Sequence, residues 1–230
     1  MRALGLPPLE SLVLLGAHCD DIAIGAGATV LALCRAYPGL DVHVLVLSGG
    51  GTPREAEERT ALEAFCPGTT PRVTVLDVPD GRLPTHWERA KEELEGFRRG
   101  RAGDAEERSS TRPLDPDLVL APSRHDDHQD HRGLALLAPT VFRDHLILGY
   151  EILKTDPDLA QPAVLVGLDA DAVAEKSRLL HEHYPSQVDR AWFDDEMFRG
   201  LARIRGVQAG TRYAEGFHPT RMLVTPAPPT

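Results

Sequence analysis

Short apolar runs alternate along the chain with longer segments whose apolar residues recur at helical spacing. The runs typical of buried strands are 11–18, 41–50, 71–78, 115–123, 145–153 and 162–168, and 221–225 predicts a short edge strand. The segments with helical spacing are 22–37, 52–65, 87–100, 131–145, 170–184 and 189–206. This alternation predicts β-α-β units, and therefore an α/β fold with an open, mostly parallel sheet and helices on both faces.

The length of the chain limits how many domains it forms. Its 230 residues lie within the range that one α/β domain commonly fills, so we expect a single Rossmann-like domain over 1–230. The polar segment 98–117 predicts a surface loop that either covers a pocket or is simply solvated. The tail 226–230 predicts a frayed end.

Charge and composition exclude some classes of binding partner and indicate where the protein is located. The chain carries 25 basic and 35 acidic side chains, a net charge of −10, which is the wrong sign for a protein that binds nucleic acid. No stretch reaches the roughly 18 apolar residues of a membrane span, and the N-terminal apolar run is too short for a signal peptide. Because the three cysteines are odd in number, we expect no disulfide framework and a cytoplasmic location. The sequence does not predict the oligomeric state.

Two groups of histidines and aspartates follow two of the predicted strands. GAHCDD (16–21) ends the first strand, and SRHDDHQDHR (123–132) follows the strand at 115–123. Because parallel sheets bind ligands at the carboxyl ends of their strands, we expect the two groups to meet. Imidazole and carboxylate suit a catalytic zinc ion with three protein ligands. The candidates are His18, Asp20 or Asp21, and one of His125, His128 and His131.

The aspartates and histidines that do not bind the metal could take part in catalysis. An aspartate that does not bind the metal can accept a proton from water, and a spare histidine can stabilise an oxyanion or protonate a leaving amine. The alternative is a pair of solvated turns, but so many carboxylates placed together are costly without a cation. Gly25 and Gly27 could instead form a dinucleotide-binding loop, yet the third glycine of that pattern is missing. We expect these glycines to let the helix pack closely on the sheet.

With these residues, the chain resembles the PIG-L/LmbE-like family of zinc-dependent N-deacetylases. The family motif A-H-P-D-D-E corresponds to 17–22, and D-x-H-x-D-H is intact at 126–131. Weaker matches are Arg54-x-x-Glu57, Lys176, 183–187 and 213–217 followed by Arg221. The first motif has two departures, because Cys19 replaces the proline and Ile22 replaces the glutamate. Cys19 is either a filler of the turn or a soft metal ligand.

The resemblance implies a role for each motif residue. The implied zinc ligands are His18, Asp21 and His131, and the implied general base is Asp20. His128 would stabilise the tetrahedral intermediate and help the amine leave, oriented by Asp130. The implied reaction is hydrolysis of an N-acetyl amide, commonly on a 2-acetamido sugar, to acetate and a free amine. A site of two histidines and one aspartate also accepts Fe²⁺, Co²⁺ or Ni²⁺.

Recognition of the substrate depends on residues outside these motifs. Arg54 and Asp80 follow the second and third predicted strands, on the same rim as the motifs, and are candidates for binding a small N-acetylated substrate. One alternative is an amidase of the same mechanism acting on a larger N-acyl or thiol-conjugate substrate. Another is a metal-binding homologue that has lost its activity, because the first motif departs from the family pattern.

Overall fold

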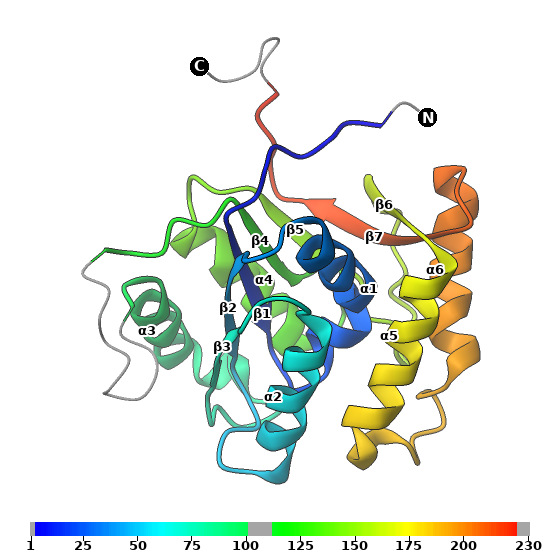
Figure 1. The fold of residues 1–230 in the computed structure, drawn as a ribbon. Helices are drawn as coiled ribbons and strands as arrows, with labels where there is room; N and C mark the ends of the chain where they lie inside the picture. The colour runs from blue at the N-terminus through cyan, green and yellow to red at the C-terminus, as the bar shows by residue number, and fades with distance from the viewer. Residues whose placement is uncertain (1–2, 101–111, 225–230) are drawn as a thin grey trace.

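A mixed β-sheet lies between two layers of helices in the computed structural model, which describes residues 3–100 and 112–224 (Figure 1). Within those residues the strands are β1 (Ser11–Gly16), β2 (Asp41–Val46), β3 (Arg72–Val75), β4 (Leu118–Pro122), β5 (Ile147–Tyr150), β6 (Val164–Leu168) and β7 (Tyr213–Pro219). They are ordered β3-β2-β1-β4-β5-β7-β6. The first five run parallel, and β7 is antiparallel to both of its neighbours. The predicted fold class is confirmed.

The helices divide between the two faces of the sheet. They are α1 (Asp21–Ala36), α2 (Pro53–Phe65), α3 (Trp87–Arg98), α4 (Gln129–Val141), α5 (Ala170–His183) and α6 (Asp195–Ala209), with short 3₁₀ turns at Leu83–Thr85 and Pro185–Gln187. One core joins α1, α2, α5 and α6 to the sheet, and a second core joins α3 and α4 to its other face (Figure 1). Coverage on both sides explains why the central strands are apolar runs rather than alternating patterns.

The parallel pairing of β1 with β4 brings the two motif segments together. Leu12 pairs with Leu118 and Leu14 pairs with Leu120, so both strands end at the same edge of the sheet. The turn after β1 leads into α1, and the loop after β4 leads into α4. Each motif therefore lies at the carboxyl end of a strand and at the start of a helix.

The glycines of α1 allow close packing, as the sequence predicted. A Cβ atom on Gly25 would overlap the ring of Tyr150 and lie 2.9 Å from the Glu151 carbonyl oxygen, and one on Gly27 would lie 2.7 Å from the Phe65 ring. The Tyr150 hydroxyl in turn donates to the Leu15 carbonyl at 2.6 Å. This contact ties β5 to β1 beneath the helix.

The predicted edge strand at 221–225 is wrong in its position. The last strand is β7, which lies between β5 and β6 rather than at an edge, while 221–224 form no strand and position 225 lies outside the described residues. Glu215 interrupts the apolar pattern of β7, but its carboxylate accepts from the N–H groups of Ala28 and Thr29 at 3.2 and 2.7 Å and pairs with Lys176 at 2.6 Å. A charged residue is tolerated in this interior strand because it is fully paired.

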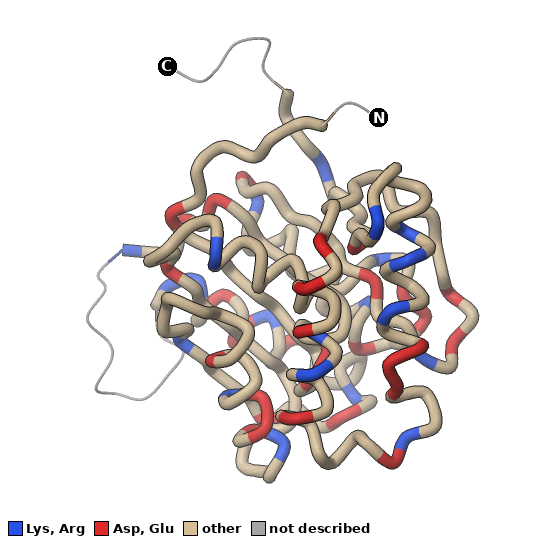
Figure 2. The backbone as a smooth tube through the Cα atoms, turned by 45° about the vertical axis from the view of Figure 1, so that its right-hand side comes forward, with Lys and Arg blue, Asp and Glu red and all other residues tan. Residues whose placement is uncertain are grey.

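Parts of the other predictions fall outside the described residues. Most of the predicted loop at 98–117 lies there, together with the tail 226–230, so the idea of a lid remains a prediction. In the described chain no helix has the length and apolar character needed to cross a membrane. Acidic and basic residues are interspersed along the visible backbone, between longer stretches of other residues (Figure 2).

Candidate metal centre

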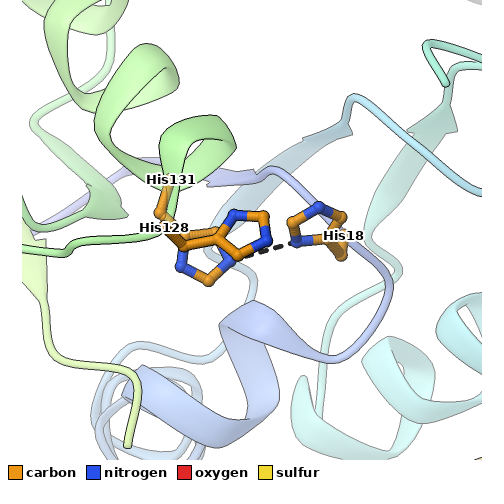
Figure 3. A group of neighbouring side chains, drawn as sticks. All are labelled: His18, His128 and His131. Atoms are coloured by element: carbon orange, nitrogen blue, oxygen red, sulfur yellow. Dashed lines mark hydrogen bonds between the residues drawn. The ribbon is translucent and has the colours of Figure 1, made fainter. Parts of the chain in front are cut away.

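His18 lies in the turn between β1 and α1, with both ring nitrogens close to polar groups. Its Nε2 atom is 3.1 Å from a carboxylate oxygen of Asp130 and 3.1 Å from one of Asp80. Its Nδ1 atom is 3.0 Å from Nε2 of His131, in the first turn of α4 (Figure 3). The imidazole therefore has carboxylates on one side and a second imidazole on the other.

His131 has the same kind of surroundings. Its Nδ1 atom lies 2.8 Å from an oxygen of Asp126, and its Nε2 atom lies 3.1 Å from Oδ1 of Asp21. The other oxygen of Asp21 accepts from the backbone N–H groups of Ala17 and His18, each at 2.9 Å. Asp21 is thereby fixed with one oxygen turned to the imidazole of His131.

The arrangement fits a divalent cation. Atoms bonded to a tetrahedral zinc ion at about 2.0–2.1 Å are about 3.3–3.4 Å apart. The Nε2 atom of His131 is 3.0 Å from His18 Nδ1 and 3.1 Å from Asp21 Oδ1, whereas the 3.6 Å distance from His18 Nδ1 is to the other oxygen of Asp21, Oδ2. The other ring nitrogen of each histidine, Nε2 of His18 and Nδ1 of His131, which we call the outer nitrogen, contacts a carboxylate. Contacts of this kind orient metal-binding histidines. Donor atoms of His18, His128 and His131 lie within 4.8 Å of one another, as do those of His18, Asp80 and Asp130. Asp21 adds a carboxylate beside the imidazoles of His18 and His131.

Buried carboxylates make this cluster favourable for positive charge. Burial alone would lower the pKa of His131, but Asp21 and Asp126 raise it to about 9. Burial also lowers the pKa of His18, but Asp21, Asp130 and Asp80 together outweigh it, and the pKa of His18 is raised well above its usual range. The pKa of Asp21 is held well below its ordinary value, despite burial, by His131 and His18. A bound cation would be stabilised by the same carboxylates.

Asp20 occupies the N-cap of α1 in an unusual backbone conformation. Its φ is 112°, and it is the one non-glycine residue with positive φ in the described part of the chain. Its carboxylate accepts from Nη2 of Arg54 at 2.8 Å. Burial and the neighbouring Asp21 carboxylate raise the pKa of Asp20 to about 7, and Arg54 opposes them.

His128 and Asp130 are both near the cluster, but not in the expected relationship. The His128 ring lies 4.9 Å from the ring of His18 and 4.5 Å from that of His131, centroid to centroid (Figure 3). The Asp130 carboxylate contacts His18 and the N–H groups of Gly81 and Leu83, rather than the imidazole of His128. It is the backbone N–H of Asp130 that donates to Nδ1 of His128, at 3.3 Å, which leaves Nε2 for a substrate.

A cavity of about 300 Å³ opens beside His18, large enough for a small molecule. Arg54 and Asp80 both line it. Arg54 is also bound to Asp20 and to the Cys19 carbonyl, whereas the Asp80 side chain is 77% exposed. The Cys19 thiol donates to the Ser48 carbonyl at 3.4 Å, and burial raises its pKa, so it is a neutral thiol. This contact favours the filler role over the metal-ligand role.

Three residues that contact the site received no role from the sequence. Asp126 belongs to the second motif. Its position five residues before His131 could have predicted from the sequence that it contacts this histidine. Lys154 lies 2.8 Å from Asp126 and 2.8 Å from Asp158. Glu58 is buried against the turn at Asp20. Glu58 lies on the same face of α2 as the buried Ala61, Leu62 and Phe65. A glutamate at a position of the helix where the pattern predicts an apolar residue could have identified it from the sequence.

Comparison with known families decides the classification. Residues 13–142, more than half of the chain, match the model of the PIG-L family, described as GlcNAc-PI de-N-acetylase. The chain belongs to the PIG-L family. The matched region of this PIG-L protein runs from β1 to the end of α4 and includes both motifs. A search of curated proteins found no match.

Solved structures similar to this PIG-L protein share its fold. One is the N,N'-diacetylchitobiose deacetylase of Pyrococcus horikoshii, at 22% identity over 92% of this chain and 84% of that one, with a TM-score of 0.67. Another is a conserved protein of Thermus thermophilus, at 23% identity over 96% and 100% of the two chains, with a TM-score of 0.68.

A third similar structure belongs to an enzyme with different chemistry. It is the 4-carboxy-2-hydroxymuconate hydratase of Pseudomonas putida, at 18% identity over 95% and 99% of the chains, with a TM-score of 0.65. Because the PIG-L fold is shared by a deacetylase and a hydratase, the reaction has to be argued from the site.

Proposed function

We propose that this protein is a metal-dependent hydrolase that removes an N-acetyl group from a small substrate, most simply a 2-acetamido sugar or its conjugate. The observation that carries the proposal is the pair His18 and His131. Their inner nitrogens are 3.0 Å apart, and their outer nitrogens contact Asp130 and Asp126. Two imidazoles oriented in this way, beside Asp21, form a set of ligands with the chemistry of a catalytic zinc site.

In this proposal His18, Asp21 and His131 hold the metal. The family resemblance supports zinc, and the ligand types also suit Fe²⁺, Co²⁺ or Ni²⁺. When bound, the cation would polarise the acetyl carbonyl and make a neighbouring water molecule more acidic.

Asp20 would carry the proton and His128 would stabilise the developing charge. The Asp20 carboxylate would accept a proton from the attacking water as the new C–O bond forms at the acetyl carbon. His128, whose Nδ1 accepts from the Asp130 N–H, would donate a hydrogen bond from Nε2 to the developing oxyanion and so help the amine leave. The proton held by Asp20 would then pass to the nitrogen as the C–N bond breaks, so the products are acetate and a free amine and Asp20 is returned to its carboxylate form.

Arg54 and Asp80 are proposed to bind the substrate at the rim of the cavity. Asp80 is the better candidate for a sugar hydroxyl, since its carboxylate is largely exposed. Arg54 is bound to Asp20, so its direct part in binding would be smaller.

The test combines elemental analysis of the purified protein with an acetate-release assay. The panel contains N-acetylglucosamine and its glycosides, and larger N-acyl and thiol-conjugated amides. Acetate from the sugars supports the proposal, while release of only the larger acyl groups would identify an amidase of the same mechanism. A metal-loaded protein that hydrolyses no amide in the panel would contradict the proposal and favour an inactive homologue.

A further inference from the structure

Helix α2 contacts the turn before α1 through two side chains that are one helical turn apart, Arg54 and Glu58. Nη2 of Arg54 donates to Oδ2 of Asp20 at 2.8 Å and also to the carbonyl of Cys19. Oε2 of Glu58 accepts from the backbone N–H of Asp20 at 2.9 Å. One helix thus holds Asp20 at its carboxylate and at its backbone.

The backbone of Asp20 needs such support. A φ of 112° with a ψ of −23° is unfavourable for a residue with a Cβ atom, and a conformation of this kind persists only where its surroundings fix it. Asp20 is also buried, at 7% exposure, so its N–H requires a partner within the protein. In the described part of the chain, that N–H donates to the carboxyl group of Glu58.

Burying Glu58 at this position costs folding free energy. It is fully buried on a helix face that otherwise carries Ala61, Leu62 and Phe65, and burial raises its pKa to about 8. Its other contact is the hydroxyl of Tyr184, which donates to the same Oε2 atom at 2.6 Å. A leucine here would serve the core at lower cost, because a buried carboxyl group loses its hydration.

Position 22 does not supply the carboxyl group that contacts this turn. It holds Ile22, which is 1% exposed and packs in the core. The glutamate that contacts the turn is Glu58, from α2.

We propose that Glu58 is a positioning residue, which holds the Asp20 backbone so that the Asp20 carboxylate is fixed for its part in the reaction. The inference rests on the proposed function, in which Asp20 is the general base. Glu58 acts through the acceptor atom Oε2, so an amide oxygen in the same place serves equally well.

The activity test compares kcat and KM of the metal-loaded wild type with those of Glu58→Leu, Glu58→Gln and Tyr184→Phe. Leucine removes the acceptor, whereas glutamine keeps it. Tyr184→Phe is the matched control, because it removes the other partner of Glu58 and leaves Asp20 untouched. We expect kcat of Glu58→Leu to fall by at least about tenfold with KM within about threefold, since a small displacement of a catalytic group is costly. The other two variants should stay within about threefold of wild type.

A second readout does not depend on activity. Hydrogen exchange of the Asp20 amide, followed by NMR, should be slow in the wild type and in Glu58→Gln, and at least about tenfold faster in Glu58→Leu. Should the leucine variant fail to fold, Glu58→Met supplies the same comparison, because its flexible side chain adapts to the cavity.

Three results would overturn the positioning role: a wild-type kcat in Glu58→Leu, unchanged exchange of the Asp20 amide in that variant, or a Glu58→Gln enzyme as impaired as the leucine form. The proposed function fails separately, if the wild type releases no acetate. In that case the exchange of the Asp20 amide alone decides the inference.

Discussion

The Nδ1 atom of His18 lies 3.0 Å from the Nε2 atom of His131, although 113 positions separate the two residues. The contact follows from the pairing of β1 with β4, which ends both strands at one edge of the sheet. Each histidine is then oriented by carboxylates on its outer nitrogen, Asp130 and Asp80 for His18 and Asp126 for His131. The sheet brings the two histidines together and the carboxylates orient them.

Removing the charge of Asp126 should weaken metal binding without removing a ligand. Asp126→Asn replaces the carboxylate that lies 2.8 Å from Nδ1 of His131, and losses of such partners typically cost about 10- to 100-fold in metal affinity. A competition titration with a chelator of known affinity measures the change. The control is Asp127→Asn, at the exposed neighbouring position, which should bind metal as wild type does. Equal affinities in the two variants would contradict the orienting role of Asp126.

The close packing of α1 can be tested with two helical glycines. Gly25→Ala should lower the free energy of unfolding by roughly 1–3 kcal/mol, because the new methyl group overlaps the Tyr150 ring. Gly96→Ala, in α3, has open space around its Cβ position and should raise stability by about 0.5–1 kcal/mol, since alanine favours a helix. Denaturant unfolding of both variants gives the comparison. A gain in stability from Gly25→Ala would refute the proposed packing.

Much of this architecture was predictable because its causes are local. Strands buried on both faces must be apolar runs, and the helices between them show helical spacing, so the order of elements can be read directly from the chain. The two motifs could be placed at one edge of the sheet because parallel strands share the direction of their ends. The family motifs then added the division of roles among His18, Asp20, Asp21, His128 and His131, which geometry alone leaves open.

The features that the sequence did not predict depend on contacts between distant segments. β7 was missed because Glu215 breaks its apolar pattern, and only Lys176 and the N–H groups of α1 make that charge acceptable. Asp130 contacts His18 rather than the His128 imidazole, because two backbone N–H groups before α3 also bind its carboxylate. The contact of Glu58 with Asp20 likewise forms only when α2 packs against the turn.

The buried Glu58 should give the protein a distinctive dependence of stability on pH. Burial raises its pKa from 4.5 to about 8 in the folded state, so the folded protein binds this proton more tightly than the unfolded chain does. Stability from Glu58 is therefore fully present below pH 4.5 and is lost as pH rises through about 8. At about 1.4 kcal/mol per pKa unit, the loss is on the order of 5 kcal/mol.

The measurement is the free energy of unfolding of wild type and Glu58→Gln, at the same metal concentration, from pH 5 to about pH 9. The wild type should lose stability relative to the glutamine variant as pH rises, since glutamine does not ionise. A difference between the two proteins that stays constant over this range would show that Glu58 does not titrate as we expect.

The most direct test of the account is the separation of metal binding from turnover at Asp20. Asp20→Asn should retain the metal content of wild type, because the proposed ligands His18, Asp21 and His131 are unchanged, and its rate of acetate release should fall at least about 100-fold, the usual contribution of a general base. Asp171→Asn, at an exposed aspartate in the first turn of α5 that does not line the cavity, is the matched control and should retain both properties. Metal-loaded Asp20→Asn with the wild-type rate of acetate release would contradict the assignment of Asp20 as the base.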